Sequence, residues 1–149
     1  MTDIHDLLEQ DHRSVKNDLS KIGLTEGEGK TERAMLFGRV RSALKVHMDF
    51  EEKTFYPAAR EATGMVDQVR DGVQEHREAK DLLAEISDLD QASNEWRDKV
   101  NDLAAALDHH IRDEEEKLFP RSREKLTADQ KNAMGSDYQK LVDEAEATG

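Results

Sequence analysis

The sequence of 149 residues contains no cysteine, which excludes disulfide bridges, thiolate metal ligands and thiol nucleophiles. No stretch approaches the roughly 20 apolar residues that a membrane-spanning helix needs, so we expect no membrane partner. Residues 1–5 have neither a basic region nor an apolar run, so no signal peptide is visible and a cytoplasmic protein is expected. Only two prolines and eight glycines interrupt the chain, which suits a helix-rich protein.

Positive charge is also in short supply. The chain has 34 acidic and 22 basic residues, which give a net charge of −12. A field of that sign repels a phosphate backbone, so nucleic acid is not expected as a partner. The acidic surface would suit a basic electron donor. Although 38% of the residues are charged, the apolar ones recur at helical spacing, which disordered chains rarely show.

Five segments show this helical spacing and predict an all-α fold. The segments are residues 2–22, 31–63, 65–87, 93–123 and 128–146. Their lengths and short connections favour a single domain over residues 1–149: an up-down-up-down four-helix bundle with an additional C-terminal helix packed outside it. The two predicted hairpins cover about 2–63 and 65–123.

Local signals refine these boundaries. Gly23 and the polar run 25–29 end the first helix and form a loop. Pro57 lies inside the second helix, where it predicts a kink or a loosened turn. Thr127 and Gln130 form a capping box for the fifth helix. Gly135 is expected to interrupt that helix.

The chain repeats a pattern of its own. Residues 47–57 align without gaps on residues 110–120, and the short pieces 11–13 and 75–77 also match. Each half therefore offers one histidine, followed about 35 residues later by a His-x-x-x-Glu pair. The residues that share this pattern are His12, His47, Glu51, His76, His110 and Glu114.

These six polar residues lie on the apolar rows of the helices. His12, for example, continues the row of Leu8 and Val15, at steps of four and three residues. All six side chains are therefore expected to point into the core. Burying two carboxylates without counter-charge costs several kcal/mol per ion, and Lys80 is the only cation on these rows. The missing charge is most simply a metal, and imidazole with carboxylate suits iron, manganese or zinc.

Other polar residues have simpler interpretations. His5 and His109 are taken as hydrogen-bonded or surface histidines, since His109 leaves both the apolar row and the repeat. The acidic neighbours of Glu51 and Glu114 are assigned to the solvated face. Tyr56 lies five residues beyond Glu51, about 140° round an α-helix, and is a poor ligand candidate unless Pro57 distorts the turn.

The doubled pattern resembles the hemerythrin-like HHE cation-binding family over most of the chain. That resemblance implies a four-helix bundle with two non-haem iron ions, bridged by carboxylates and an oxo or hydroxo group. The six residues of the repeat would be the ligands, and zinc or manganese is a less favoured occupant. A ferritin-like site would need two Glu-x-x-His pairs. Only Glu9 and His12 form one here, because Val73 occupies the equivalent position before His76.

One position departs from the oxygen-carrying members of that family. They have a fifth histidine one turn after the third-helix histidine, where this chain has Lys80. Two open coordination positions then remain instead of one, which favours an oxidoreductase acting on hydrogen peroxide, oxygen or nitric oxide. Lys80 would donate a hydrogen bond to a bound oxygen species or swing into solvent. The alternatives are a module that binds or senses oxygen, nitric oxide or iron, and a structural zinc site.

Overall fold

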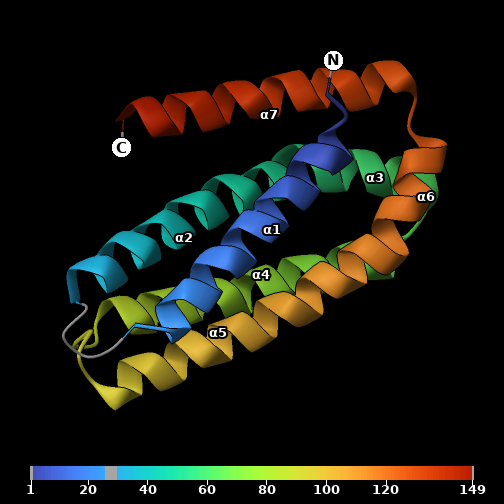
Figure 1. Ribbon diagram of the computed structural model, residues 1–149. Coiled ribbons are helices and arrows are strands. Elements are labelled where there is room, and N and C mark those ends of the chain that lie inside the picture. Colours follow the sequence, from blue (N-terminus) through green and yellow to red (C-terminus); the bar gives the residue numbers. More distant parts are fainter. Residues whose placement is uncertain (1, 26–29, 149) are drawn as a thin grey trace.

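The computed structural model describes residues 2–25 and 30–148, and every regular element in those ranges is helical (Figure 1). The elements are α1 (Ile4–Gly23), α2 (Lys30–Phe50), η1 (Glu51–Phe55), α3 (Tyr56–Thr63), α4 (Val66–Ser87), α5 (Asn94–Asp113), η2 (Glu114–Leu118), α6 (Phe119–Lys125) and α7 (Ala128–Thr148). Segments α2–η1–α3 and α5–η2–α6 are each continuous. The predicted bundle with its fifth, C-terminal helix is therefore confirmed, while the loop expected over 26–29 lies outside the described residues.

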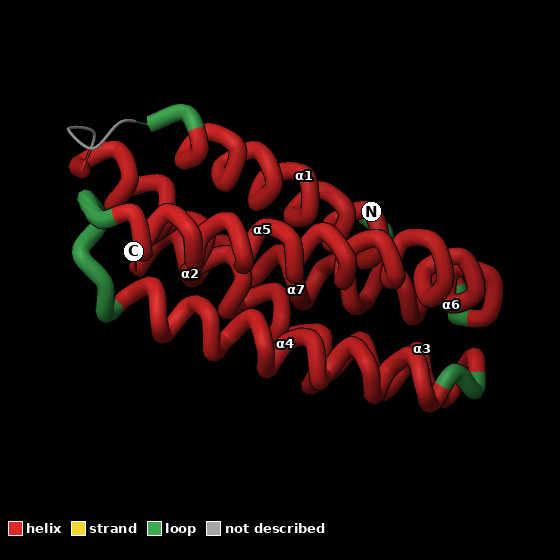
Figure 2. The backbone as a smooth tube through the Cα atoms, turned by 90° about the horizontal axis from the view of Figure 1, so that it is seen from below, coloured by secondary structure: helices red, strands yellow, loops and turns green. Residues whose placement is uncertain are grey.

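The helix ends follow from their local sequence. Asp3 caps α1 by accepting a hydrogen bond from the backbone N–H of His5. Ser93 caps α5 by accepting one from the backbone N–H of Trp96. The predicted capping box before α7 is present: Thr127 and Gln130 each accept a hydrogen bond from the other's backbone. Figure 2 shows that the connections gather at the two ends of the helices. In the part of the chain that is described, no helix is long and apolar enough to cross a bilayer.

Helices α2 and α5 each change to a π-helical turn just before a proline. In η1 the backbone N–H of Tyr56 donates to the carbonyl of Glu51, and in η2 that of Phe119 donates to Glu114. A proline ring clashes with the carbonyl four residues earlier and removes a hydrogen bond, so a widened turn relieves the contact. The loosened turn expected near Pro57 is therefore present, and the repeat reproduces it before Pro120.

The core has two apolar sections with a polar layer between them. Leu8 and Phe55 belong to one section, while Val15 and Leu44 belong to the other. His12 lies between Leu8 and Val15 along α1, so the polar layer crosses the bundle near its middle. Burial of apolar surface on both sides holds the four helices in register around that layer.

Helix α7 packs across α1 and α2, on the outside of the bundle (Figure 1). Met134 and Tyr138 are its buried anchors. Gly135 does not interrupt the helix, contrary to the sequence-based expectation, because it has a packing role. A Cβ at Gly135 would lie 1.9 Å from the carbonyl oxygen of Thr2, so only glycine permits this close approach.

Replacing Gly135 with alanine should therefore destabilise the protein by about 1–3 kcal/mol, because α7 must shift away from the rigid backbone at Thr2. Gly38→Ala is the matched control. Gly38 is an exposed residue within α2, where a Cβ would meet open space among the described residues, and alanine should stabilise the helix by about 0.5–1 kcal/mol. Urea unfolding measures both, and equal effects of the two substitutions would contradict the packing role.

Candidate metal centre

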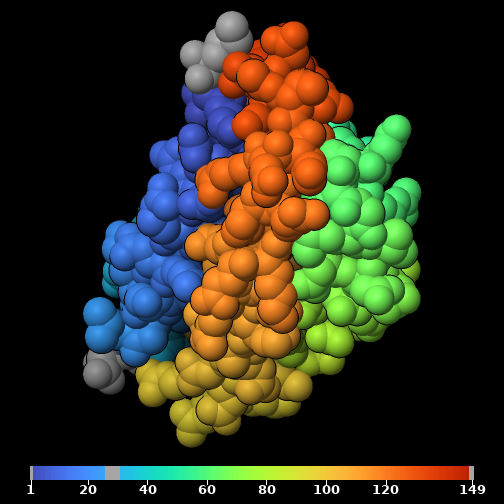
Figure 3. Space-filling model, turned by 90° about the vertical axis from the view of Figure 1, so that its right-hand side faces the viewer, coloured from blue at the N-terminus to red at the C-terminus, as the bar shows by residue number. Residues whose placement is uncertain are grey.

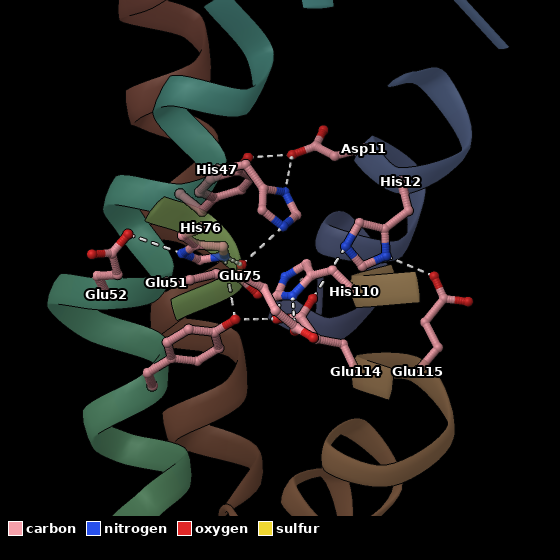
Figure 4. A network of polar contacts seen from close by, with 12 residues as sticks. Asp11, His12, His47, Glu51, Glu52, Glu75, His76, His110, Glu114 and Glu115 are labelled. Carbon is pink, nitrogen blue, oxygen red and sulfur yellow. Dashed lines mark hydrogen bonds and ion pairs between the residues drawn. The ribbon is translucent and has the colours of Figure 1, made fainter. Parts of the chain in front are cut away.

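Six side chains from four helices meet in the polar layer (Figure 4). They are the residues singled out by the repeat: His12, His47, Glu51, His76, His110 and Glu114. None of them is more than 6% exposed. The helical rows therefore placed these residues correctly, and their role as metal ligands stays a prediction.

Glu51 lies between histidines of the two hairpins. Its Oε1 is 3.2 Å from His47 Nε2 on α2 and 3.1 Å from His76 Nε2 on α4. The step from His47 to Glu51 spans four residues, so both side chains project from the same face of one helix. The carboxylate thus links a histidine of the first hairpin to a histidine of the second.

Glu114 makes the equivalent link on the other side of the layer. Its Oε1 is 3.3 Å from His12 Nε2, and its Oε2 is 3.4 Å from His110 Nε2. Two overlapping groups of donors result, and they share this glutamate. One consists of His12, His47 and Glu114, and the other of Glu51, His76, His110 and Glu114. Within each group the donor atoms lie within 4.8 Å of one another, which suits two neighbouring ions with a shared carboxylate.

Several inward-facing atoms of this cluster lack hydrogen-bond partners. Among the described residues, the buried atoms without one are Nε2 of His12, His47 and His110, Oε2 of Glu51 and Oε1 of Glu114. Of the short distances given above, that between His76 Nε2 and Glu51 Oε1 meets hydrogen-bond geometry, whereas the other three are ion-pair distances that do not. Leaving buried polar atoms unsatisfied costs about 1–3 kcal/mol each, and more when they are charged. A cation would satisfy all of them at once, so the donor set fits a metal.

Each of the four histidines also binds an acidic side chain through its outer nitrogen. The contacts to Nδ1 are Asp11 with His47 at 3.1 Å, Glu115 with His12 at 2.6 Å, Glu52 with His76 at 2.9 Å and Glu75 with His110 at 2.7 Å. A carboxylate can only accept, so each Nδ1 donates, and in the neutral ring Nε2 then has a lone pair that faces the centre. Such partners fix the tautomer and orientation of metal-binding histidines.

These acidic partners were not recognised from the sequence. Glu52 and Glu115 had been assigned to the solvated face, whereas they are only 27% and 36% exposed and hold His76 and His12. The internal repeat did contain a signal for these acidic partners. Asp11 and Glu75 occupy equivalent positions, as do Glu52 and Glu115, so acidity recurs at both places.

Tyr56 belongs to the cluster because of the π-turn. Its hydroxyl donates to Glu114 Oε2 and lies 3.3 Å from His76 Nε2, on which its ring is stacked. The widened turn is the distortion on which the sequence interpretation depended, and it rotates Tyr56 inward. Gly72 makes room, since a Cβ there would lie 2.7 Å from the tyrosine oxygen. Burial and the charge of Glu114 raise the pKa of Tyr56, so it keeps its proton.

Lys80 lies at the outer edge of the cluster. Its amino group is 3.1 Å from Glu52 Oε2, and the side chain is 43% exposed. Because Glu52 in turn accepts from His76, the structure connects Lys80 to the cluster through that carboxylate. This geometry favours the outward orientation of Lys80 over a direct contact with a bound oxygen species.

The two remaining histidines lie outside the six. His5 is fully buried, with hydrogen bonds to Asp3 and Ser122, as expected of a core histidine. His109 is 69% exposed and contacts Glu75 and Asp113.

A small apolar cavity lies against the four histidines. Its further lining includes Val15, Leu44, Met48, Ala79, Leu107 and Ile111, together with the outer carboxylates Asp11 and Glu75. The centre of a water-sized sphere can move through about 20 Å³ of it, which is room for one small molecule. The cavity therefore offers space for one small molecule beside the histidines.

Without a cation, the surroundings of His47 and His110 favour the protonated form of these two histidines. Burial alone would lower the pKa of His47, but the charge of Glu51 and the hydrogen bond to Asp11 raise it to about 10. The pKa of His110 shifts in the same direction. Burial would raise the pKa of Glu114, but His110 holds it well below the usual range. Protonated His47 and His110 would therefore supply the positive charge beside the glutamates in metal-free protein.

Comparisons with known proteins agree with this geometry. Residues 3–122 match the Hemerythrin HHE cation binding domain. A crystal structure of a hemerythrin HHE cation binding domain-containing protein from Mycobacterium kansasii superposes with a TM-score of 0.84 at 23% identity, covering 99% of this chain and 90% of that one. A curated relative from Nostoc sp., named DNA nickase, is 27% identical over 135 residues. The match covers 91% of this chain but only 38% of that relative.

The protonated cluster predicts how the metal-free protein responds to pH. Above about pH 6.5 the unfolded chain loses the His47 proton that the folded chain keeps up to about pH 10. The folded state then binds more protons, so the free energy of unfolding should fall as the pH rises through this range. Urea unfolding in chelator at pH 6.5, 8 and 9.5 measures it. Metal-loaded protein should show a nearly flat profile, and a rise with pH in chelator would contradict the prediction.

Proposed function

The chain belongs to the hemerythrin HHE cation binding domain family, and on that premise we propose that it is a di-iron oxidoreductase acting on hydrogen peroxide, oxygen or nitric oxide. The observation that carries this proposal is the pair of donor groups sharing Glu114, with their inward atoms unpartnered. Iron fits a donor set of nitrogen and oxygen alone, and the chain has no sulfur ligand of the kind that structural zinc sites usually include.

The two ions would occupy the two donor groups. His12, His47 and Glu114 would hold one ion, and Glu51, His76 and His110 would hold the other together with the shared Glu114. When bound, iron supplies open coordination positions and a change of oxidation state. The protein keeps each imidazole in one tautomer through its outer carboxylate and excludes bulk water by burial. These residues therefore prepare the site before any substrate arrives.

The space beside the histidines favours a small substrate. A cavity with about 20 Å³ for the centres of water-sized spheres accepts a molecule such as peroxide or a diatomic gas, and its walls are largely apolar. Lys80 stands where oxygen carriers of this family place a further histidine, and its amino group is turned toward Glu52. An extra open position on the metals is the reason to favour turnover over carriage.

Tyr56 would act as a proton donor in this reaction. Its hydroxyl holds a proton at hydrogen-bonding distance from Glu114 and lies beside His76 Nε2. Breaking an oxygen–oxygen bond or reducing oxygen consumes protons, and a buried donor at a fixed distance delivers them without admitting water. In the repeat, Phe119 occupies the equivalent position and stacks on His12, so only one half of the cluster has this donor.

A non-catalytic module that binds or senses oxygen, nitric oxide or iron is the second candidate, because the same cavity and donors serve reversible binding. Reversible spectral change on oxygenation, without turnover, would favour it. A structural zinc site predicts zinc rather than iron after expression without added metal. The name of the Nostoc relative describes a much longer protein, and the charge of −12 on this chain favours small molecules over nucleic acid as partners.

Substituting a bridging glutamate tests the metal centre. Glu114→Ala should abolish binding of at least one of the two irons, because Glu114 belongs to both donor groups. Glu116→Ala is the matched control, since this exposed glutamate lies two residues away in the same π-turn. Metal analysis of both purified variants, together with near-ultraviolet absorption, decides the outcome. Full iron content in Glu114→Ala would show that the shared ligand is wrongly assigned.

Oxygen release from hydrogen peroxide tests the proposed reaction. Iron-loaded wild-type protein should exceed free iron at equal concentration, and failure to do so would reject the peroxide version. Tyr56→Phe should keep its iron and its fold, since phenylalanine already fills the equivalent position 119. Loss of the proton donor should lower its turnover by about 10²–10⁴-fold, the usual range for general acids. Unchanged turnover would remove Tyr56 from the mechanism.

A further inference from the structure

The two halves of the repeat differ on their outer faces. When the two halves of the repeat are aligned, Glu75 corresponds to Asp11. In the same alignment His109 corresponds to Val46, and Asp113 corresponds to Phe50. In the first half, α7 covers these positions. The ring of Tyr138 lies 5.0 Å from that of Phe50, and its hydroxyl donates to Asp11. That side of the cluster is therefore closed by an apolar contact and a hydrogen bond.

The second half instead presents three possible ligands near the surface. His109 Nε2 is 3.3 Å from Glu75 Oε2 and 3.4 Å from Asp113 Oδ2. His109 and Asp113 are four residues apart on α5, and Glu75 faces them from α4. Lys117 pairs with the other oxygen of Asp113, which leaves Oδ2 directed at the group. One imidazole and two carboxylates form a donor set for a divalent first-row cation.

This outer group is connected to the buried cluster in two ways. The second oxygen of Glu75 accepts a hydrogen bond from His110 Nδ1 at 2.7 Å, so one carboxylate contacts both sites. A small crevice is also lined by Glu75 and Asp113 together with Tyr56 and Glu114 of the cluster. Glu114 is 4% exposed, and its Oε2 accepts the hydrogen bond from Tyr56 in this crevice lining. The crevice belongs to the seam between the orange α5–η2–α6 segment and the green α3–α4 segment in Figure 3.

We propose that Glu75, His109 and Asp113 form an outer site for Fe²⁺ or a similar divalent cation, from which the buried centre is loaded. The loading role rests on the proposed di-iron function, whereas the outer site itself does not. A buried centre must receive its ions through the wall of the bundle. A site at the surface collects them from solution, and the acidic surface raises their local concentration. Glu75 then holds the ion one side chain away from His110.

Co²⁺ titration tests the outer site directly. The protein is first loaded with iron at the buried centre, and excess metal is then removed. Calorimetry should show that this protein binds one further Co²⁺ per chain. His109→Ala and Asp113→Asn, prepared in the same way, should lose that binding. Glu116→Gln removes the same charge from a nearby exposed position and should retain it. Equal binding by wild type and His109→Ala, or no further binding by wild type, would overturn the proposal.

The rate of iron uptake tests the loading role. Metal-free wild type and His109→Ala, mixed anaerobically with Fe²⁺, should reach the same final iron content. The variant should fill about tenfold more slowly or worse, the scale of rate effects that charged funnels produce. Equal rates would overturn the loading role. If wild type takes up no buried iron at all, the proposed di-iron function fails and the loading role with it. The outer site is then tested by comparing Co²⁺ binding of metal-free wild type with that of metal-free His109→Ala.

Discussion

Two glutamates in the middle of an apolar bundle impose the constraint on which the rest of this structure depends. Glu51 and Glu114 are buried, and apolar core lies on both sides of them. A buried carboxylate is stable in its charged form only with nearby positive charge. That charge can come from protonated His47 and His110, whose pKa values are raised, or from metal ions that the four imidazoles would bind. The raised pKa of His47 corresponds to the protonated form of the cluster. The unpartnered inward atoms correspond to the metal-bound form.

The two forms exclude each other, which links metal binding, folding and pH. A cation has to displace the protons of the imidazoles, because a coordinating nitrogen needs its lone pair. The outer carboxylates prepare this exchange by keeping the remaining proton of each ring on Nδ1. They also differ from the inner pair in exposure. Glu52 and Glu115 reach partly into solvent, so their charge is screened there and costs less than that of Glu51.

Sequence reasoning found the six central residues because helical spacing and an internal repeat both constrain the same positions. Helical spacing of the apolar residues also predicted the five helices. It missed the outer carboxylates, since periodicity assigns a residue to a face but not to a partner on another helix. The side of Tyr56 depended on whether the turn before Pro57 is α or π, which the spacing alone leaves open. Gly135 was misjudged because its close neighbour, Thr2, is distant in sequence.

The departures from the repeat argue for chemistry at this centre rather than for a structural role. Structural metal sites are typically closed, with every coordination position filled by the protein. Here one half has Tyr56 where the other has Phe119, and one outer face is covered by α7 where the other presents His109 with two carboxylates. Tyr56 and the open face belong to the same crevice, which Tyr56 and Glu75 both line. A bundle that only needed a metal to hold it together would gain nothing from making its two halves different in these particular places.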